Sequence, residues 1–204
     1  MSSVEAAVMV NRPVYFEGMI EKAEQLARRW MPGLRQGPAK RKAWEHPQDL
    51  VSLLTKEMDF IETPAEEQEK RVAVAWLHDI LEDGKKEDGT TVSVQDLCDE
   101  GIRPQVIADV LALTNEGPKD AYLAQLKAKS PRAKLVKCVD RICNLREGKD
   151  AFKTKRWIRY VGETYYFIFP LTEGLPPLER NFLRQELIKA VEARQLGAAP
   201  YFGD

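Results

Sequence analysis

The stretch His78-Asp79-Ile80-Leu81-Glu82-Asp83 brings four ionisable side chains directly after an apolar run. Residues four apart share one face of an α-helix, so His78 is expected above Glu82. Asp79 is likewise expected above Asp83. Ionisable groups against an apolar helix are costly without a partner cation or a hydrogen-bond network. A divalent metal is the simplest partner; the alternative is that His78 contacts the core while Glu82 and Asp83 begin a solvated loop.

Two further residues could complete a metal site. His46 precedes Pro47 at the expected start of a helix, and Asp140 lies beside the apolar stripe of another helix. Together with His78 and Asp79 they offer two imidazoles and two carboxylates. This donor set suits Mn²⁺, Fe²⁺ or Zn²⁺ and leaves room for water. A helical scaffold can gather such ligands although they are far apart in the sequence.

The elements that must position these side chains are helices. Apolar residues recur at intervals of three and four, and no stretch alternates as a strand would. We therefore expect an all-α domain of about eight to ten helices. Ser93 and Asp96 form a capping pattern at the start of one of them. The expected helices are 16–30, 47–58, 64–83, 93–101, 104–113, 121–126, 131–146, 156–171 and 178–196.

Composition excludes several classes of protein. The 204 residues suffice for one domain, 44% of them are apolar, and the formal net charge is −1. This balance lacks the basic excess of a nucleic-acid-binding protein. Neither a signal peptide nor a membrane span is expected. The three cysteines, Cys98, Cys138 and Cys143, match no zinc pattern and are expected to be reduced in a cytoplasmic protein.

Five motifs follow one another in a fixed order. Arg35 lies eleven residues before His46-Pro47, and an alanine-rich segment ends in His-Asp-x-x-Glu-Asp. Leu113-Thr114, the run 133–146 with Asp-Arg-x-x-Asn-Leu-Arg, and Glu163-Thr164 before Pro170-Leu171 come next. Over roughly residues 15–172 this order resembles the HD-domain metal phosphohydrolases. More narrowly, it resembles the hydrolase domain of the RelA/SpoT family and its stand-alone small alarmone hydrolases.

The resemblance implies an HD-domain helical bundle and a set of roles. His46, His78, Asp79 and Asp140 would bind one metal, usually Mn²⁺ in that family, with Fe²⁺ or Zn²⁺ as further candidates. Such a metal lowers the pKa of bound water and polarises a phosphoryl oxygen. Glu82 and Asp83, one turn beyond the ligands, are expected to be catalytic, because they could orient that water or carry its proton.

Five residues are candidates for substrate binding. By the resemblance, Arg35 would lie against the nucleobase, and Asn144, one turn after Asp140, could reach the ribose or its phosphate. The alternative for Arg35 is a solvated loop charge. Lys119, Lys137 and Arg141 could neutralise phosphate. The alternative for these three cations is that they form only ordinary ion pairs.

The chain also departs from the family pattern, although no departure removes a ligand. Gly84 stands where threonine is usual, Val139 where alanine is usual, and Cys143 where an aromatic residue or histidine is common. The segment between His46 and His78 is several residues longer. Cys143 and this longer segment leave the choice between guanine and adenine open.

The leading functional interpretation is a (p)ppGpp or ppApp 3′-pyrophosphohydrolase of the stringent response, which releases pyrophosphate and a nucleoside 5′-diphosphate. An HD phosphatase of other nucleotides and a non-catalytic nucleotide-binding regulatory module are the alternatives. A pure binding module would have no need of Glu82 and Asp83. The expected partner is a small-molecule nucleotide, and the oligomeric state is open. Residues 1–12 are expected to be a flexible arm, 13–172 the HD domain, and 173–204 a C-terminal helix and tail packed on it.

Overall fold

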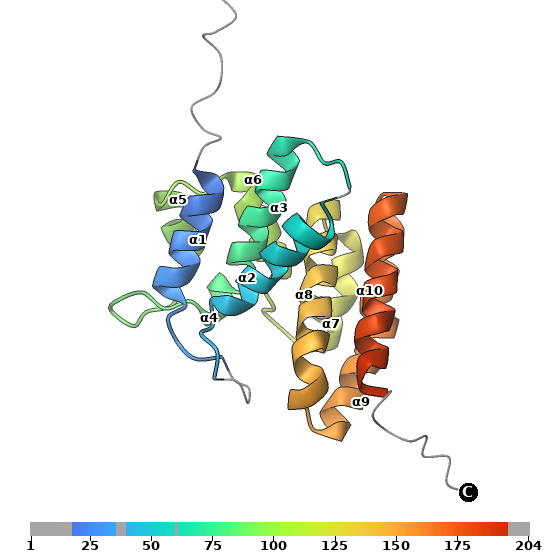
Figure 1. Cartoon of the computed structure of the whole chain (residues 1–204). Coiled ribbons are helices and arrows are strands. Elements are labelled where there is room, and N and C mark those ends of the chain that lie inside the picture. The colour runs from blue at the N-terminus through green and yellow to red at the C-terminus, as the bar shows by residue number, and fades with distance from the viewer. Residues whose placement is uncertain (1–17, 36–39, 60, 196–204) are drawn as a thin grey trace, which may run out of the picture.

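The described part of the chain is helical throughout. The computed structural model describes residues 18–35, 40–59 and 61–195 (Figure 1). Within these ranges, extended backbone pairs only in two isolated bridges, Leu34 with Lys42 and Lys85 with Thr91. The expected all-α class is therefore confirmed. The α-helices are α1 (Met19–Trp30), α2 (Glu45–Ser52), α3 (Ala65–Leu77), α4 (Ile80–Asp83), α5 (Val94–Asp99), α6 (Pro104–Leu113), α7 (Lys119–Gln125), α8 (Pro131–Ala151), α9 (Thr154–Glu163) and α10 (Pro177–Gln195).

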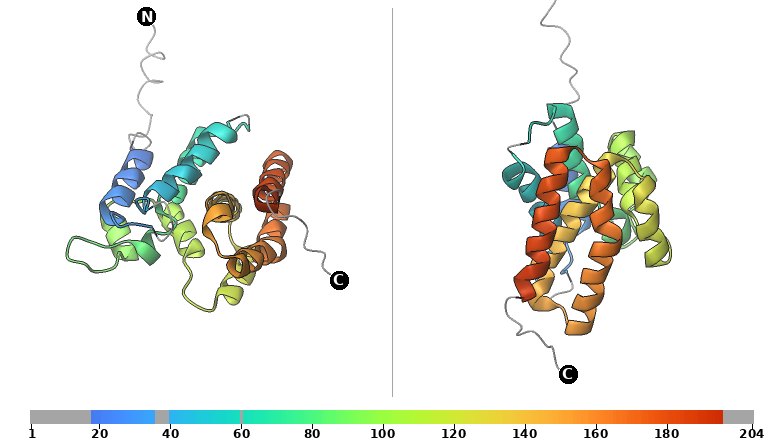
Figure 2. Two further views of the ribbon diagram at one scale, coloured as in Figure 1. Left: turned by 60° about the horizontal axis from the view of Figure 1, so that its bottom comes forward. Right: turned by 90° about the vertical axis from the view of Figure 1, so that its right-hand side faces the viewer.

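Helix α8 runs through the middle of the bundle. Its start follows from the sequence, because Ser130 Oγ accepts a hydrogen bond from the Ala133 N–H at 3.0 Å and Pro131 fixes the first turn. Helices α2, α3 and α6 pack on one side of it and α10 packs along another (Figure 2). Side chains all around α8 are buried, among them Leu135 and Ile142. A helix in this position carries its polar residues, including Asp140, into the interior.

The helix expected over residues 64–83 is interrupted at His78-Asp79. Helix α3 ends at Leu77, Asp79 has φ −101° and ψ 2°, and α4 begins at Ile80. At this break His78 Nδ1 hydrogen-bonds the Ala75 carbonyl at 2.8 Å, the acceptor that the Asp79 N–H would use in a continuous helix. The expectation of one unbroken face from His78 to Glu82 was therefore wrong.

The aromatic segment expected as one helix over residues 156–171 is also divided. Helix α9 ends at Glu163, a π-helical turn covers Thr164–Ile168, and a 3₁₀ segment covers Phe169–Gly174. Pro170 contributes to this change because it has no N–H to continue the α-helical ladder. Two shorter helical pieces extend other helices, a π-turn at Leu53–Glu57 and a 3₁₀ turn at Leu126–Ala128.

The sequence also led to expectations about a helix cap, the cysteines, the domain boundaries and membrane-spanning helices. The capping box of Ser93 and Asp96 is present at the start of α5. All three cysteines are free, with Cys98 exposed and the other two buried. The expected arm 1–12 and the end of the expected tail lie outside the described residues, and the domain boundaries stay a prediction. In the part of the chain that the structure describes, no helix is long and apolar enough to cross a bilayer.

Candidate metal centre

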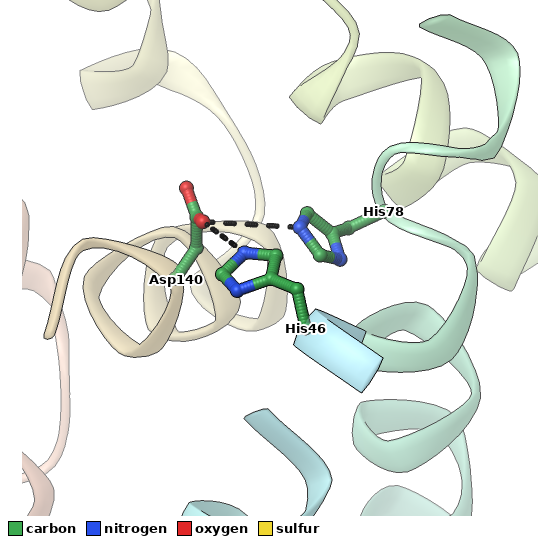
Figure 3. A group of neighbouring side chains, drawn as sticks. All are labelled: His46, His78 and Asp140. Carbon is green, nitrogen blue, oxygen red and sulfur yellow. Dashed lines mark hydrogen bonds and ion pairs between the residues drawn. The ribbon is translucent and has the colours of Figure 1, made fainter. Parts of the chain in front are cut away.

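Three separate helices deliver the side chains of one buried cluster. His46 lies in the first turn of α2, His78 directly follows α3, and Asp140 lies midway along α8. One ligand atom from each lies within 4.8 Å of the others (Figure 3). His46 Nε2 is 3.0 Å from Asp140 Oδ1, and His78 Nε2 is 3.8 Å from the same oxygen. At most 5% of each residue is exposed, so the cluster lies in the core.

One ring nitrogen of His78, Nε2, has no hydrogen-bond partner. Its Nδ1 faces the Ala75 carbonyl, which can only accept, so Nδ1 carries a proton. The buried Nε2 forms no hydrogen bond, although Asp79 Oδ2 lies at 3.1 Å and Asp140 Oδ1 at 3.8 Å. A lone pair directed at carboxylate oxygens needs a proton or a cation between them. The donor set therefore fits a divalent metal, with the His78 ring oriented by the Ala75 carbonyl.

Asp79 lies at the edge of this cluster. Its side chain is 28% exposed, unlike the three buried residues, and it reaches the centre through His78. Burial would raise the pKa of the Asp79 carboxyl, but the neighbouring imidazole of His78 outweighs that effect and lowers the pKa. Asp79 is thus an anion beside the cluster, and its role as a fourth ligand stays a prediction.

Asp140 is held as an anion by two neighbours. Burial alone would raise the pKa of its carboxyl, but the Lys137 ammonium at 2.9 Å and the hydrogen bond with His46 keep the pKa well below its usual value. The pKa of His46 is lowered, chiefly by burial. A neutral imidazole beside an ionised carboxylate is the protonation state that a metal requires of its ligands.

Glu82 and Asp83 are exposed residues of α4, which begins directly after His78 and Asp79. The pKa of each carboxyl is raised, in both cases mainly by partial desolvation and further by the nearby charge of Asp79. Glu82 Oε1 also accepts a hydrogen bond of 2.7 Å from the Asn115 N–H, which fixes it against the loop between α6 and α7. Raised carboxyl pKa values suit proton transfer near neutral pH, although the catalytic role of this pair stays a prediction.

Two of the candidate substrate-binding residues meet next to Asp140. Asn144 Oδ1 accepts a hydrogen bond from Arg35 Nη2, and Asn144 Nδ2 donates one to Asp140 Oδ1. Arg35 Nε also lies 3.3 Å from Glu147 Oε2. The loop arginine is therefore brought to the cluster across a long sequence separation. Glu147 was missed by sequence analysis, although its place one turn after Asn144 on α8 was a signal.

The three other candidate cations each have an acidic partner. Lys137 pairs with Asp140, and Lys119 Nζ lies 2.6 Å from Glu163 Oε2. Arg141 is 2% exposed; its Nη1 lies 3.5 Å from the same Glu163 oxygen, and its guanidinium stacks on Tyr160 at 3.7 Å. This placement gives Arg141 no direct access to a ligand. Glu163 was noted only as part of a motif, and its bridging role was not foreseen.

Comparison with known proteins supports the fold. No family model matches the chain, and no curated protein sequence matches it. Among solved structures, one described as a metazoan ortholog of SpoT that hydrolyzes ppGpp and plays a role in starvation responses matches with a TM-score of 0.67. The match covers 88% of this chain and 98% of the other at 19% sequence identity. The chain therefore shares the all-helical fold of that protein, and the HD-domain helical bundle implied by the sequence resemblance is confirmed as a fold.

Proposed function

We propose that this protein is a metal-dependent HD hydrolase that removes the 3′-pyrophosphate of an alarmone such as ppGpp or ppApp. The observation that carries the proposal is the buried cluster, in which His78 Nε2 has no hydrogen-bond partner and faces two carboxylates beside His46. The order of the motifs around it and the fold shared with a ppGpp-hydrolysing SpoT ortholog support this substrate class.

His46, His78 and Asp140 would hold the metal, with Asp79 as the fourth ligand. A divalent ion there supplies Lewis acidity and lowers the pKa of bound water. Mn²⁺ is the proposed ion, and Fe²⁺ and Zn²⁺ suit the same donors. The chain's own contribution is orientation, because the Ala75 carbonyl holds His78 and the Lys137 ammonium holds Asp140.

Glu82 and Asp83 would receive the proton of the attacking water. Water attacks the phosphorus attached to the ribose 3′ oxygen, and the bond between that oxygen and phosphorus breaks. The 3′ oxygen takes up a proton, so the products are a nucleoside 5′-diphosphate and pyrophosphate. Glu82 is held at 2.7 Å by the Asn115 N–H, which orients its carboxylate while the other oxygen remains available. Arg35 and Asn144 would contact the nucleoside.

Product analysis tests this proposal. Metal-loaded protein incubated with ppGpp or ppApp is expected to release intact pyrophosphate and GDP or ADP, resolved by anion-exchange chromatography. Orthophosphate as the first product, or turnover of ordinary 5′-nucleotides alone, would reject the alarmone substrate. Binding of either alarmone without any turnover would instead favour a regulatory module.

One observation favours a second candidate, an HD phosphatase of other nucleotides. Lys119, Lys137 and Arg141 already have carboxylate partners, so they offer less free positive charge than two phosphate chains on one nucleoside would require. A substrate with a single phosphate group would need less positive charge in the binding site. The same chromatography with nucleoside monophosphates, read by orthophosphate release, separates the two candidates.

A further inference from the structure

The Asn144 amide connects a loop arginine to the buried cluster. Its Nδ2 donates to Asp140 Oδ1, and its Oδ1 accepts from Arg35 Nη2. A carboxylate can only accept and a guanidinium can only donate, so this orientation of the amide is the one that satisfies both neighbours. The amide is consequently held from two sides, and its position depends on where the Arg35 side chain lies.

Arg35 is in turn held by Glu147. Its Nε lies 3.3 Å from Glu147 Oε2, and the two side chains are only 23% and 20% exposed. Asn144 and Glu147 are three residues apart on α8, so they lie on one face of the helix and contact the same guanidinium. The Arg35 N–H also donates to the Arg41 carbonyl at 2.8 Å, which fixes the backbone beneath this side chain.

We propose that Glu147 and Arg35 form a positioning relay that orients Asp140 for metal binding through Asn144. The proposal rests on the metal site of the proposed function. Asp140 Oδ1, the oxygen bonded by Asn144, is the one that lies 3.0 Å from His46, while Lys137 holds Oδ2 at 2.9 Å. Groups that hydrogen-bond a ligating carboxylate fix its direction and so contribute to metal affinity. Asn144 acts on Asp140, and Arg35 acts on the metal site as well as on the nucleotide.

The test is Mn²⁺ affinity, measured by isothermal titration calorimetry on chelator-treated protein without nucleotide. Asn144→Leu keeps the approximate shape but removes both hydrogen bonds, and it is expected to weaken binding about 10–100-fold. Glu147→Gln weakens a partly exposed pair and should cost about 2–5-fold. The double variant Arg35→Ala/Glu147→Gln should bind no more weakly than Arg35→Ala, because Glu147 acts through Arg35.

Glu186→Gln is the matched control. Glu186 lies 2.7 Å from Arg146 Nη2 and so pairs with α8 without contacting Arg35, and this variant should bind Mn²⁺ like the parent protein. Equal affinity in the parent, Glu147→Gln, Arg35→Ala and Asn144→Leu would overturn the relay and leave the proposed function intact. Additive losses from Arg35→Ala and Glu147→Gln would also overturn it. A parent protein that binds none of Mn²⁺, Fe²⁺ and Zn²⁺ would overturn both proposals. Thermal unfolding of the metal-free variants distinguishes lost affinity from lost fold.

Discussion

The buried cluster and the cations paired with Glu163 satisfy their polar groups in opposite ways. In the cluster, His78 Nε2 is buried without a hydrogen-bond partner and faces two carboxylates. At Glu163, the partly exposed Lys119 and the buried Arg141 share one carboxylate oxygen. A buried polar atom without a partner carries a cost that a ligand can relieve, whereas a paired cation must first give up its partner. The difference indicates that the cluster is prepared for a cation, while the cations at Glu163 require rearrangement before they can bind an anion.

Removing a cluster ligand should have the largest effect. His78→Ala deletes one of three buried donors, so the metal and all turnover are expected to be lost. Elemental analysis of the purified variant measures the metal directly. Stoichiometric metal in His78→Ala would exclude His78 as a ligand.

Chelator treatment of the parent protein should also lower its melting temperature, because the metal binds only the folded chain.

Changing the exposed carboxylates Glu82 and Asp83 should separate chemistry from metal binding. Glu82→Gln with Asp83→Asn keeps size and hydrogen bonding but removes the proton acceptors, so turnover should fall by ~10²-fold or more. Metal content and nucleotide affinity should persist, as measured by elemental analysis and calorimetry. If turnover were near that of the parent protein, Glu82 and Asp83 would be a solvated helix end without a catalytic role.

Lys119 and Arg141, two of the three cations that pair with Glu163, differ in their exposure. Lys119 is 42% exposed, so Lys119→Met should leave stability nearly unchanged and raise the KM for the nucleotide several-fold. Arg141 is buried, so Arg141→Met should instead lower the free energy of unfolding by about 3 kcal/mol. Urea unfolding and steady-state kinetics on both variants check this. An unchanged KM in Lys119→Met would remove Lys119 from the candidate substrate contacts.

The contrast between unpaired and paired polar groups also explains which residues of the site the sequence could reveal. His46, His78 and Asp140 were recognisable because ionisable residues on apolar helices are exceptional and demand a partner. The break at Asp79, where the His78 ring hydrogen-bonds the Ala75 carbonyl, was not recognisable. Helical periodicity specifies which face a residue occupies and says nothing of such hydrogen bonds between side chain and backbone.

The acidic partners Glu147 and Glu163 were missed by sequence analysis for a different reason. Glu147 stands among other charged residues, where an acid is ordinarily a solvated group, whereas Glu163 lies among mostly uncharged residues and was noted only as part of a motif. Their roles arise from residues distant in the sequence, Arg35 for Glu147 and Lys119 for Glu163. The place of Glu147 one turn after Asn144 was a local signal, but only the tertiary fold brings these distant cations to the two carboxylates.

The smallest expected effect concerns a charge outside both regions, in the first turn of α5. The hydrogen bonds from Ser93 and then Lys86 lower the pKa of Asp96 to about 2, at the capping box of α5. A carboxyl whose pKa is lower in the folded than in the unfolded chain stabilises the fold above its unfolded pKa of about 4. This contribution is lost as the pH falls toward the folded pKa of about 2. The melting-temperature difference between the parent and Asp96→Asn should therefore be constant from pH 7 to about 5 and shrink below pH 4. A difference that persisted undiminished at pH 3 would mean that the Asp96 charge contributes nothing to the cap.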